Sequence, residues 1–206
     1  MTTIEYKNKE VRPRASFGDF VWGKSGSLKE SFCSHVINRF DTAEGVYKGR
    51  IGQNKRVDLK MKVTTDFCLN GREDWAEEDK TFCAALKEGL SEYASYLAQI
   101  HPGCIPNHYR LKDTGYKLQR YEPDGFYDWH NDWMIDRNGS RIIVFMWYLN
   151  SLKEEDGGYT EFVDGTRVQP ECGKLLLFPA TWSYLHRGYP PKVRKYLCNG
   201  WVFSKP

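Results

Sequence analysis

The chain has 206 residues, of which 40% are hydrophobic and 15% aromatic, and its formal net charge is +3. This length and composition suit one domain with a sizeable core. The basic residues are scattered and form no stripe, so nucleic acid is not an expected partner. No stretch approaches the ~20 apolar residues that a membrane helix needs, so we expect no membrane association.

Cysteine usage and the N-terminus bear on the compartment. The six cysteines are widely spaced and include no CxxC pair, a pattern that disfavours a zinc ribbon or a redox dithiol. Reduced thiols in a cytosolic compartment are the simpler interpretation, although an even count leaves disulfides open. The N-terminus lacks a basic region followed by an apolar run, so no signal peptide is indicated. We therefore expect a soluble, cytoplasmic protein.

The first half of the chain predicts two helices and one strand. Residues 1–16 are polar and basic and are expected to form a flexible arm. Ser27 and Glu30 have the spacing of a capping box, and apolar residues then recur at helical spacing, which predicts a helix over 27–40. Residues 56–69 alternate apolar and charged side chains, as in a half-buried strand. An apolar stripe predicts a second helix over 74–100.

The second half changes to short aromatic and β-branched runs separated by turn residues. Many short strands at such spacing predict a mainly β fold, here a jelly roll. The expected strands are 107–112, 116–122, 127–132, 141–149, 159–162, 166–169, 174–178, 183–188 and 194–203.

A group of possible metal ligands lies in this half. His130 and Asp132 are two residues apart, so on an extended strand both side chains leave the same face. A later histidine, His186, could complete a facial triad of two imidazoles and one carboxylate, which suits Fe(II) and leaves coordination positions open. The short motif alone is weak, because His130 and Asp132 could be a surface turn pair and His186 a hydrogen-bonded core residue.

The surrounding motifs are more specific, and residues 117–203 resemble the prolyl 4-hydroxylase branch of the 2-oxoglutarate and Fe(II)-dependent oxygenases. The resemblance implies a double-stranded β-helix, or jelly-roll barrel, braced by N-terminal helices. We expect one domain over 17–206, with a helical buttress at about 17–105 and a catalytic core at about 106–206. The matching segments are 118–121, 125–132, Arg141, 148–150, 157–162, Val168, Pro170, Gly173, Leu175, Phe178, 186–188, 195–196 and Trp201.

The resemblance also implies roles for individual residues. His130, Asp132 and His186 would be the iron ligands, and a partner that the sequence does not identify should fix the second nitrogen of each imidazole. Lys195 would pair with the distal carboxylate of 2-oxoglutarate, because an unpaired carboxylate inside a barrel is costly. The neighbouring Arg194 would face outward and is the alternative clamp. Strand alternation puts Lys195, Leu197, Asn199 and Trp201 on one face.

Further contacts follow from the same resemblance. Tyr148 would donate to the distal carboxylate, with a plain core aromatic as the alternative, and Thr160 is a weaker candidate for a further contact. Trp129, Trp133 and Trp182 are either rim residues or core. The residues implied in substrate binding are Tyr121, Tyr127, Arg141, Asn199 and Trp201.

The implied activity is hydroxylation of an unactivated C–H bond with Fe(II), 2-oxoglutarate and O2, aided by ascorbate as an accessory. The leading substrate is a prolyl residue in a protein or peptide, and a free amino acid or other small molecule is the alternative. A nucleic-acid alkyl demethylase would carry two arginines six apart beyond the distal histidine, and this chain has no such pair. A non-catalytic jelly-roll module would typically have lost a ligand, whereas all three are present.

Overall fold

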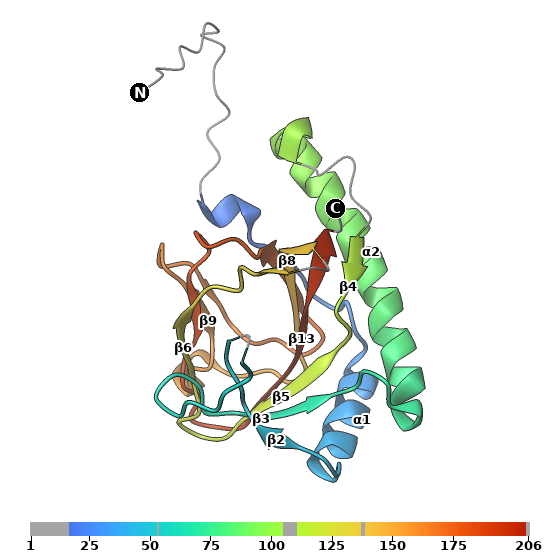
Figure 1. The fold of residues 1–206 in the computed structure, drawn as a ribbon, viewed down its shortest axis with the longest axis vertical. Helices are drawn as coiled ribbons and strands as arrows, with labels where there is room; N and C mark the ends of the chain where they lie inside the picture. Colours follow the sequence, from blue (N-terminus) through green and yellow to red (C-terminus); the bar gives the residue numbers. More distant parts are fainter. Residues whose placement is uncertain (1–16, 53, 105–110, 137–138, 205–206) are drawn as a thin grey trace, which may run out of the picture.

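The computed structural model describes residues 17–52, 54–104, 111–136 and 139–204. Two antiparallel sheets form a jelly roll, and two helices cover one side of the larger sheet (Figure 1). The arm expected at residues 1–16 lies outside the described residues. None of the helices in the described part of the chain is long and apolar enough to cross a membrane.

The larger sheet takes strands from both halves of the chain. The order of its strands is β1 (Trp22–Lys24), β11 (Leu175–Pro179), β8 (Gly139–Tyr148), β13 (Lys195–Ser204), β5 (Lys117–Tyr121), β3 (Thr65–Cys68) and β2 (Tyr47–Lys48). Two further strands pair with members of this row: β4 (Leu111–Asp113) with β13, and β7 (Ile135–Asp136) with β8.

The smaller sheet has the order β10 (Arg167–Val168), β9 (Thr160–Phe162), β12 (His186–Gly188) and β6 (Tyr127–His130). The strands expected after residue 107 all appear, with their ends shifted by a few residues, although residues 107–110 are outside the described part. The short strands β1, β2 and β7 were not expected, because two or three residues carry no alternation to detect.

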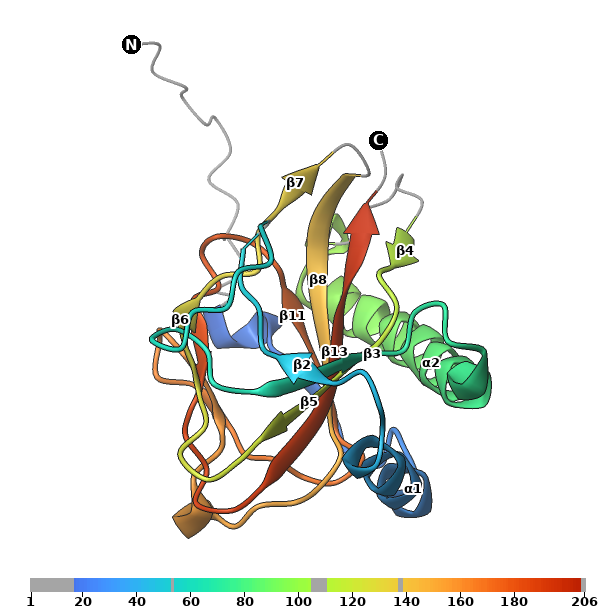
Figure 2. The same ribbon diagram turned by 60° about the horizontal axis from the view of Figure 1, so that its bottom comes forward.

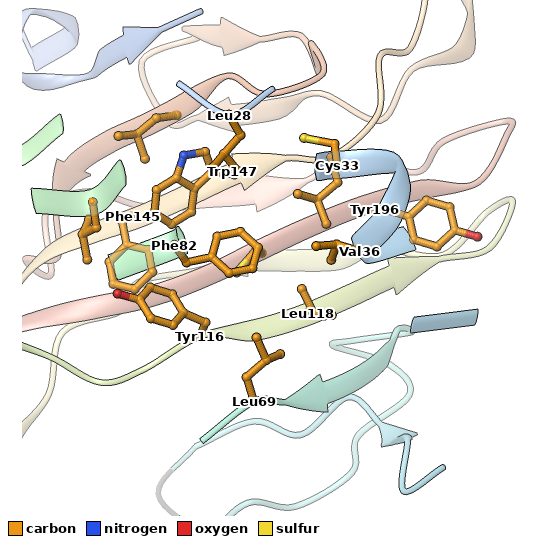
Figure 3. Close-up of a cluster of buried hydrophobic side chains, with 14 of the residues drawn as sticks. Leu28, Cys33, Val36, Leu69, Phe82, Tyr116, Leu118, Phe145, Trp147 and Tyr196 are labelled. Atoms are coloured by element: carbon orange, nitrogen blue, oxygen red, sulfur yellow. The ribbon is translucent and has the colours of Figure 1, made fainter. Parts of the chain in front are cut away.

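Helices α1 (Glu30–Asp41) and α2 (Ala76–Ile100) lie side by side on the larger sheet (Figure 2). Short 3-10 turns precede or follow regular elements at Phe17–Phe20, Glu73–Trp75, Pro102–Cys104 and Glu154–Asp156. Figure 3 shows the layer between helices and sheet, where Phe82 of α2 packs 5.4 Å from both Tyr116 and Trp147, measured between ring centres. Burial of such large aromatic side chains fixes the helices on the sheet.

The expected capping box at the start of α1 is wrong. The helix begins at Glu30, and its N-cap residue Lys29 makes no side-chain capping bond. The hydroxyl of Ser27 instead accepts a hydrogen bond from Nε1 of Trp147 at 3.1 Å. Ser27 therefore ties the segment before the helix to β8.

The prediction of a strand over 56–69 is also wrong for most of its length, because only Thr65–Cys68 form β3. The segment before β3 turns, with the amides of Met61 and Lys62 donating to the carbonyl of Asp58. Leu59 is consequently 54% exposed, and Lys62, expected to face solvent, is 1% exposed. Because of this turn, Leu59 is exposed and Lys62 is buried, the reverse of what the strand pattern predicted.

Candidate active site

The two histidines meet across the ladder of the smaller sheet. His130 on β6 and His186 on β12 are direct partners in the register, and their ring centres are 4.3 Å apart. Asp132 follows the end of β6, and its Oδ2 lies 3.6 Å from Nε2 of His186. One ligand atom from each of the three residues lies within 4.8 Å of the others, so the group could hold a single metal ion.

Backbone carbonyls orient both imidazoles. Nδ1 of His130 donates to the carbonyl of Asp128 at 2.7 Å, and Nδ1 of His186 donates to the carbonyl of Tyr184 at 3.0 Å. In each case the acceptor is two residues before the histidine. This bond places the proton on Nδ1 and leaves the lone pair of Nε2 available to a metal ion.

An aromatic stack supports His130 from one side. The ring of Tyr127 lies 3.5 Å from the imidazole of His130, measured between centres, at an interplanar angle of 13°. Burial, together with the nearby His186, lowers the pKa of His130 to about 3. The imidazole is therefore neutral near pH 7, which is the form that binds a metal ion.

Lys195, the first residue of β13, is a buried cation near this triad. Its side chain is 0% exposed, and Nζ donates to the carbonyl of Gly158 at 2.9 Å. No carboxylate within the described ranges forms an ion pair with it. Burial lowers the pKa of Lys195 to about 7. An ammonium in this setting is stabilised when a carboxylate is brought to it.

The inward and outward faces of β13 follow the predicted alternation. Arg194, just before the strand, points away and pairs with Glu122 at 2.7 Å between Nε and Oε2. The row Lys195, Leu197, Asn199 and Trp201 lines one cavity.

This cavity has a volume of about 220 Å³ and is lined by residues from both sheets. It brings together nearly all the residues singled out from the sequence: His130, Asp132, His186, Lys195, Thr160, Tyr121, Tyr127, Arg141, Asn199 and Trp201. The smaller sheet supplies the two histidines, and the larger sheet supplies the cations that face them.

Tyr148 is the one predicted contact that does not line the cavity. It is fully buried, and its hydroxyl donates to Oγ1 of Thr160 at 2.6 Å. Burial raises the pKa of Tyr148, so the phenol stays protonated. Thr160 lies between Tyr148 and the cavity and is the residue of the pair that lines it.

The three tryptophans considered as rim residues differ in position. Trp133 lines the cavity and is 50% exposed. Trp182 is 69% exposed and is not part of the lining. Trp129 is partly buried beneath Arg187, whose Cζ lies 4.8 Å from its ring centre. Only Trp133 is placed to meet a molecule entering the cavity.

Sequence reasoning missed a buried ion pair in the cavity wall. Nζ of Lys62 lies 2.9 Å from Oδ2 of Asp66, and both residues are 1% exposed. Asp66 also accepts hydrogen bonds from Thr64 at 2.6 Å and from Gln119 at 3.1 Å. A lysine and an aspartate four residues apart were the available signal, but the assumed strand pattern placed Lys62 outside.

The two charges of this pair modify each other's pKa. Burial lowers the pKa of Lys62 to about 8, and the charge of Lys117 acts in the same direction. Burial alone would raise the pKa of Asp66, but the charges of Lys62 and Lys117 outweigh it, so that this pKa is lowered. Lys62 also lies 4.9 Å from the ring centre of Tyr127, the residue stacked on His130.

Arg141 and Trp201 form a contact at the other side of the cavity. The guanidinium carbon of Arg141 lies 3.6 Å from the ring centre of Trp201, in the geometry of a cation–π interaction. Nη1 of Arg141 donates to the carbonyl of Asp132 at 3.4 Å. The guanidinium is thus placed next to Asp132 of the His-Asp-His group and over an aromatic face.

Comparison with known sequences agrees with this geometry. Residues 116–203 match the model of the 2OG-Fe(II) oxygenase superfamily. A PKHD-type hydroxylase from Synechococcus sp. (strain CC9902) is 27% identical over 90 residues, which are 42% of this chain and 40% of that protein. The match therefore spans well under half the length of that relative.

Several solved prolyl hydroxylases have a similar fold. A viral collagen prolyl hydroxylase from Paramecium bursaria Chlorella virus-1 has a TM-score of 0.64 at 20% identity, covering 91% of this chain and 97% of that one. A Trichoplax adhaerens prolyl hydroxylase, solved with a hypoxia-inducible factor peptide, has a TM-score of 0.67 at 19% identity and coverages of 90% and 84%. A Pseudomonas putida prolyl-4-hydroxylase has a TM-score of 0.62 at 19% identity, covering 90% of this chain and 93% of that one.

Proposed function

We propose that the protein is an Fe(II)- and 2-oxoglutarate-dependent dioxygenase that hydroxylates a prolyl residue in a protein or peptide. The match of residues 116–203 to the model of the 2OG-Fe(II) oxygenase superfamily supports this proposal. The observation that carries the proposal is a buried lysine without a described anionic partner in the same cavity as a His-Asp-His group. The His-Asp-His group suits the metal, and the buried lysine suits the co-substrate. We also propose that residues 17–206 act as one domain, since strands from both halves share the larger sheet.

His130, Asp132 and His186 would hold the iron, and Lys195 would bind the distal carboxylate of 2-oxoglutarate. Bound iron would supply O2 activation coupled to oxidative decarboxylation of 2-oxoglutarate to succinate and CO2. The chain itself orients the imidazoles through the carbonyls of Asp128 and Tyr184. Thr160 offers a hydroxyl to the co-substrate, and Tyr148 holds that hydroxyl in place. Ascorbate remains a predicted accessory.

The walls of the cavity favour a prolyl substrate. Tyr121 and Tyr127 present aromatic surface to the interior, which suits an apolar and rigid pyrrolidine ring. Arg141 is fixed over Trp201 and can donate hydrogen bonds to backbone carbonyls of an extended peptide. The prolyl hydroxylases of similar fold support the same substrate class.

The test is a mass measurement on proline-containing peptides incubated with Fe(II), 2-oxoglutarate and ¹⁸O2. We expect one oxygen atom from O2 to be added to proline, more on a peptide than on free L-proline at equal concentration. Trp201→Ala and Arg141→Ala should reduce this product while iron binding persists. If free amino acids are hydroxylated and no proline peptide is, the small-molecule alternative replaces the prolyl peptide.

A further inference from the structure

We infer that the substrate carries a carboxylate, and that Lys117 and Arg141 bind it beside Trp201. This inference deepens the proposed function and rests on it, because it concerns the substrate of the same cavity. Nζ of Lys117 lies 5.2 Å from the ring centre of Trp201, and Cζ of Arg141 lies 3.6 Å from it. The two cations come from different strands, β5 and β8, and share one indole.

The charges that line the cavity are strongly unequal. Asp132 is the one carboxylate among the described lining residues. Five cations line the cavity: Arg50, Lys62, Lys117, Arg141 and Lys195. In the proposed function Asp132 faces the iron and Lys195 takes 2-oxoglutarate. Lys62 is already paired with Asp66. Arg141 donates to the carbonyl of Asp132, and Lys117 has no carboxylate within hydrogen-bond distance in the described structure. The lining of the cavity therefore carries more positive than negative charge.

Lys117 has no carboxylate of its own within hydrogen-bond distance in the described structure. Its nearest one is Asp66, 3.9 Å from Nζ to Oδ2. Asp66 already accepts hydrogen bonds from Lys62, Thr64 and Gln119. The ammonium of Lys117, whose side chain is 21% exposed, can thus be offered to a ligand. A charge-assisted hydrogen bond is stronger than a neutral one, so a carboxylate is the favoured ligand.

Asn199 adds a second observation that points to a ligand at this place. It pairs directly with Lys117 in the β5–β13 register, lines the cavity and is 9% exposed. Its buried Oδ1 has no hydrogen-bond partner among the described residues. A buried amide oxygen without a partner is costly, and an N–H donor on the ligand would satisfy it.

Amino acids and their derivatives bring both a carboxylate and an N–H donor. An aspartate or glutamate next to the hydroxylated proline in a peptide would supply the carboxylate from a side chain and the donor from the backbone. The α-carboxylate and amine of a free amino acid are the other source of the same groups. The peptide form is the one that agrees with the proposed function.

The experiment measures binding in the absence of O2, with Fe(II) and 2-oxoglutarate bound. Two matched pairs of ligands are titrated: a capped peptide with Asp beside proline against its Asn counterpart, and free L-proline against L-prolinamide. We expect the carboxylate form of a pair to bind about tenfold more tightly, and the preference to weaken with added salt. A preference in the first pair identifies a peptide side chain, and one confined to the second pair identifies an α-carboxylate.

Variants of Lys117 decide whether this residue is responsible. Lys117→Gln should abolish the preference, and Lys117→Glu should reverse it toward a peptide with Lys in place of Asp. Lys87→Gln, an exposed lysine on α2 outside the cavity lining, is the matched control and should leave the preference intact. The inference is overturned if the two ligands of each pair bind with equal affinity, or if no ligand binds measurably. It is also overturned if Lys117→Gln leaves the preference for the carboxylate form unchanged. Failure of the proposed function is seen separately, as absence of 2-oxoglutarate turnover or of proline oxidation.

Discussion

Lys195 and Tyr121 are direct partners in the β13–β5 ladder, and Nζ of Lys195 lies 4.1 Å from the centre of the Tyr121 ring. The ring face and the carbonyl of Gly158 are neutral partners that stabilise the ammonium only partly. Burial lowers the pKa of Lys195 to about 7 for this reason. A carboxylate that enters the cavity would complete the ion pair.

We expect Lys195→Ala to weaken 2-oxoglutarate binding a hundredfold or more. Losing one partner of a desolvated ion pair typically costs about 3–5 kcal/mol, and each ~1.4 kcal/mol is a factor of ten. Arg194→Ala is the matched control and should have little effect, because Arg194 faces outward and pairs with Glu122. The measurement is a calorimetric titration without O2. The reverse ranking of the two variants would show that the wrong cation has been assigned to the clamp.

The affinity for 2-oxoglutarate should fall as the pH rises above about 7. The pKa of Lys195 is lowered to about 7 in the free protein, so above this pH the amine is mostly neutral and binding must take up a proton. Each further pH unit should then cost up to about tenfold in affinity. Titrations from pH 6 to 8.5, in buffers with different ionisation enthalpies, measure both the affinity and the proton uptake.

Lys195→Arg serves as the control for this pH dependence, because a guanidinium stays charged over the whole range. The dependence should therefore flatten in the variant, even if its absolute affinity is lower. A wild-type affinity that is constant between pH 6 and 8.5, with no proton uptake, would contradict the role given to Lys195.

Breaking the buried pair of Lys62 and Asp66 should destabilise the fold. Lys62→Met leaves a buried carboxylate without its ammonium, which typically costs about 3–5 kcal/mol in free energy of unfolding. The double variant Lys62→Met/Asp66→Leu should lose less than the sum of the single variants. Urea denaturation of the three variants gives the comparison. Additive losses would mean that the two charges do not depend on each other.

An exposed pair provides the control for that cycle. Lys80 and Glu77 lie 2.7 Å apart on the surface of α2, with side chains 73% and 82% exposed. Water and salt screen such a pair, so Lys80→Met should produce no measurable change in stability.

The sequence indicated the second half of the fold well, because alternation and turn residues there agree with the final contacts. The inward row from Lys195 to Trp201 could be predicted from strand periodicity alone. The segment 57–63 could not, since its alternation is the same as that of a real strand. Its position depends on distant backbone bonds, such as the amide of Val63 donating to the carbonyl of Phe126 at 2.8 Å.

The partners that orient His130 and His186 were also beyond sequence reasoning. Both acceptors are backbone carbonyls, those of Asp128 and Tyr184, and every residue type provides such a group. Lys62 and Lys117 were missed for another reason. The burial of Lys62 depends on Asp66, and the placement of Lys117 depends on Trp201. Each partner lies close to its lysine only after the larger sheet has formed.

The most direct test of the proposed oxygenase is an anaerobic titration with Fe(II). We expect the wild-type protein to bind one equivalent per chain, and His130→Ala and His186→Ala to lose this binding while circular dichroism shows the fold intact. His35→Ala is the matched control, because His35 lies on α1 and contacts Glu78 rather than the cavity. It should bind iron as the wild type does. Undiminished iron binding by either His130→Ala or His186→Ala would contradict the proposed metal centre.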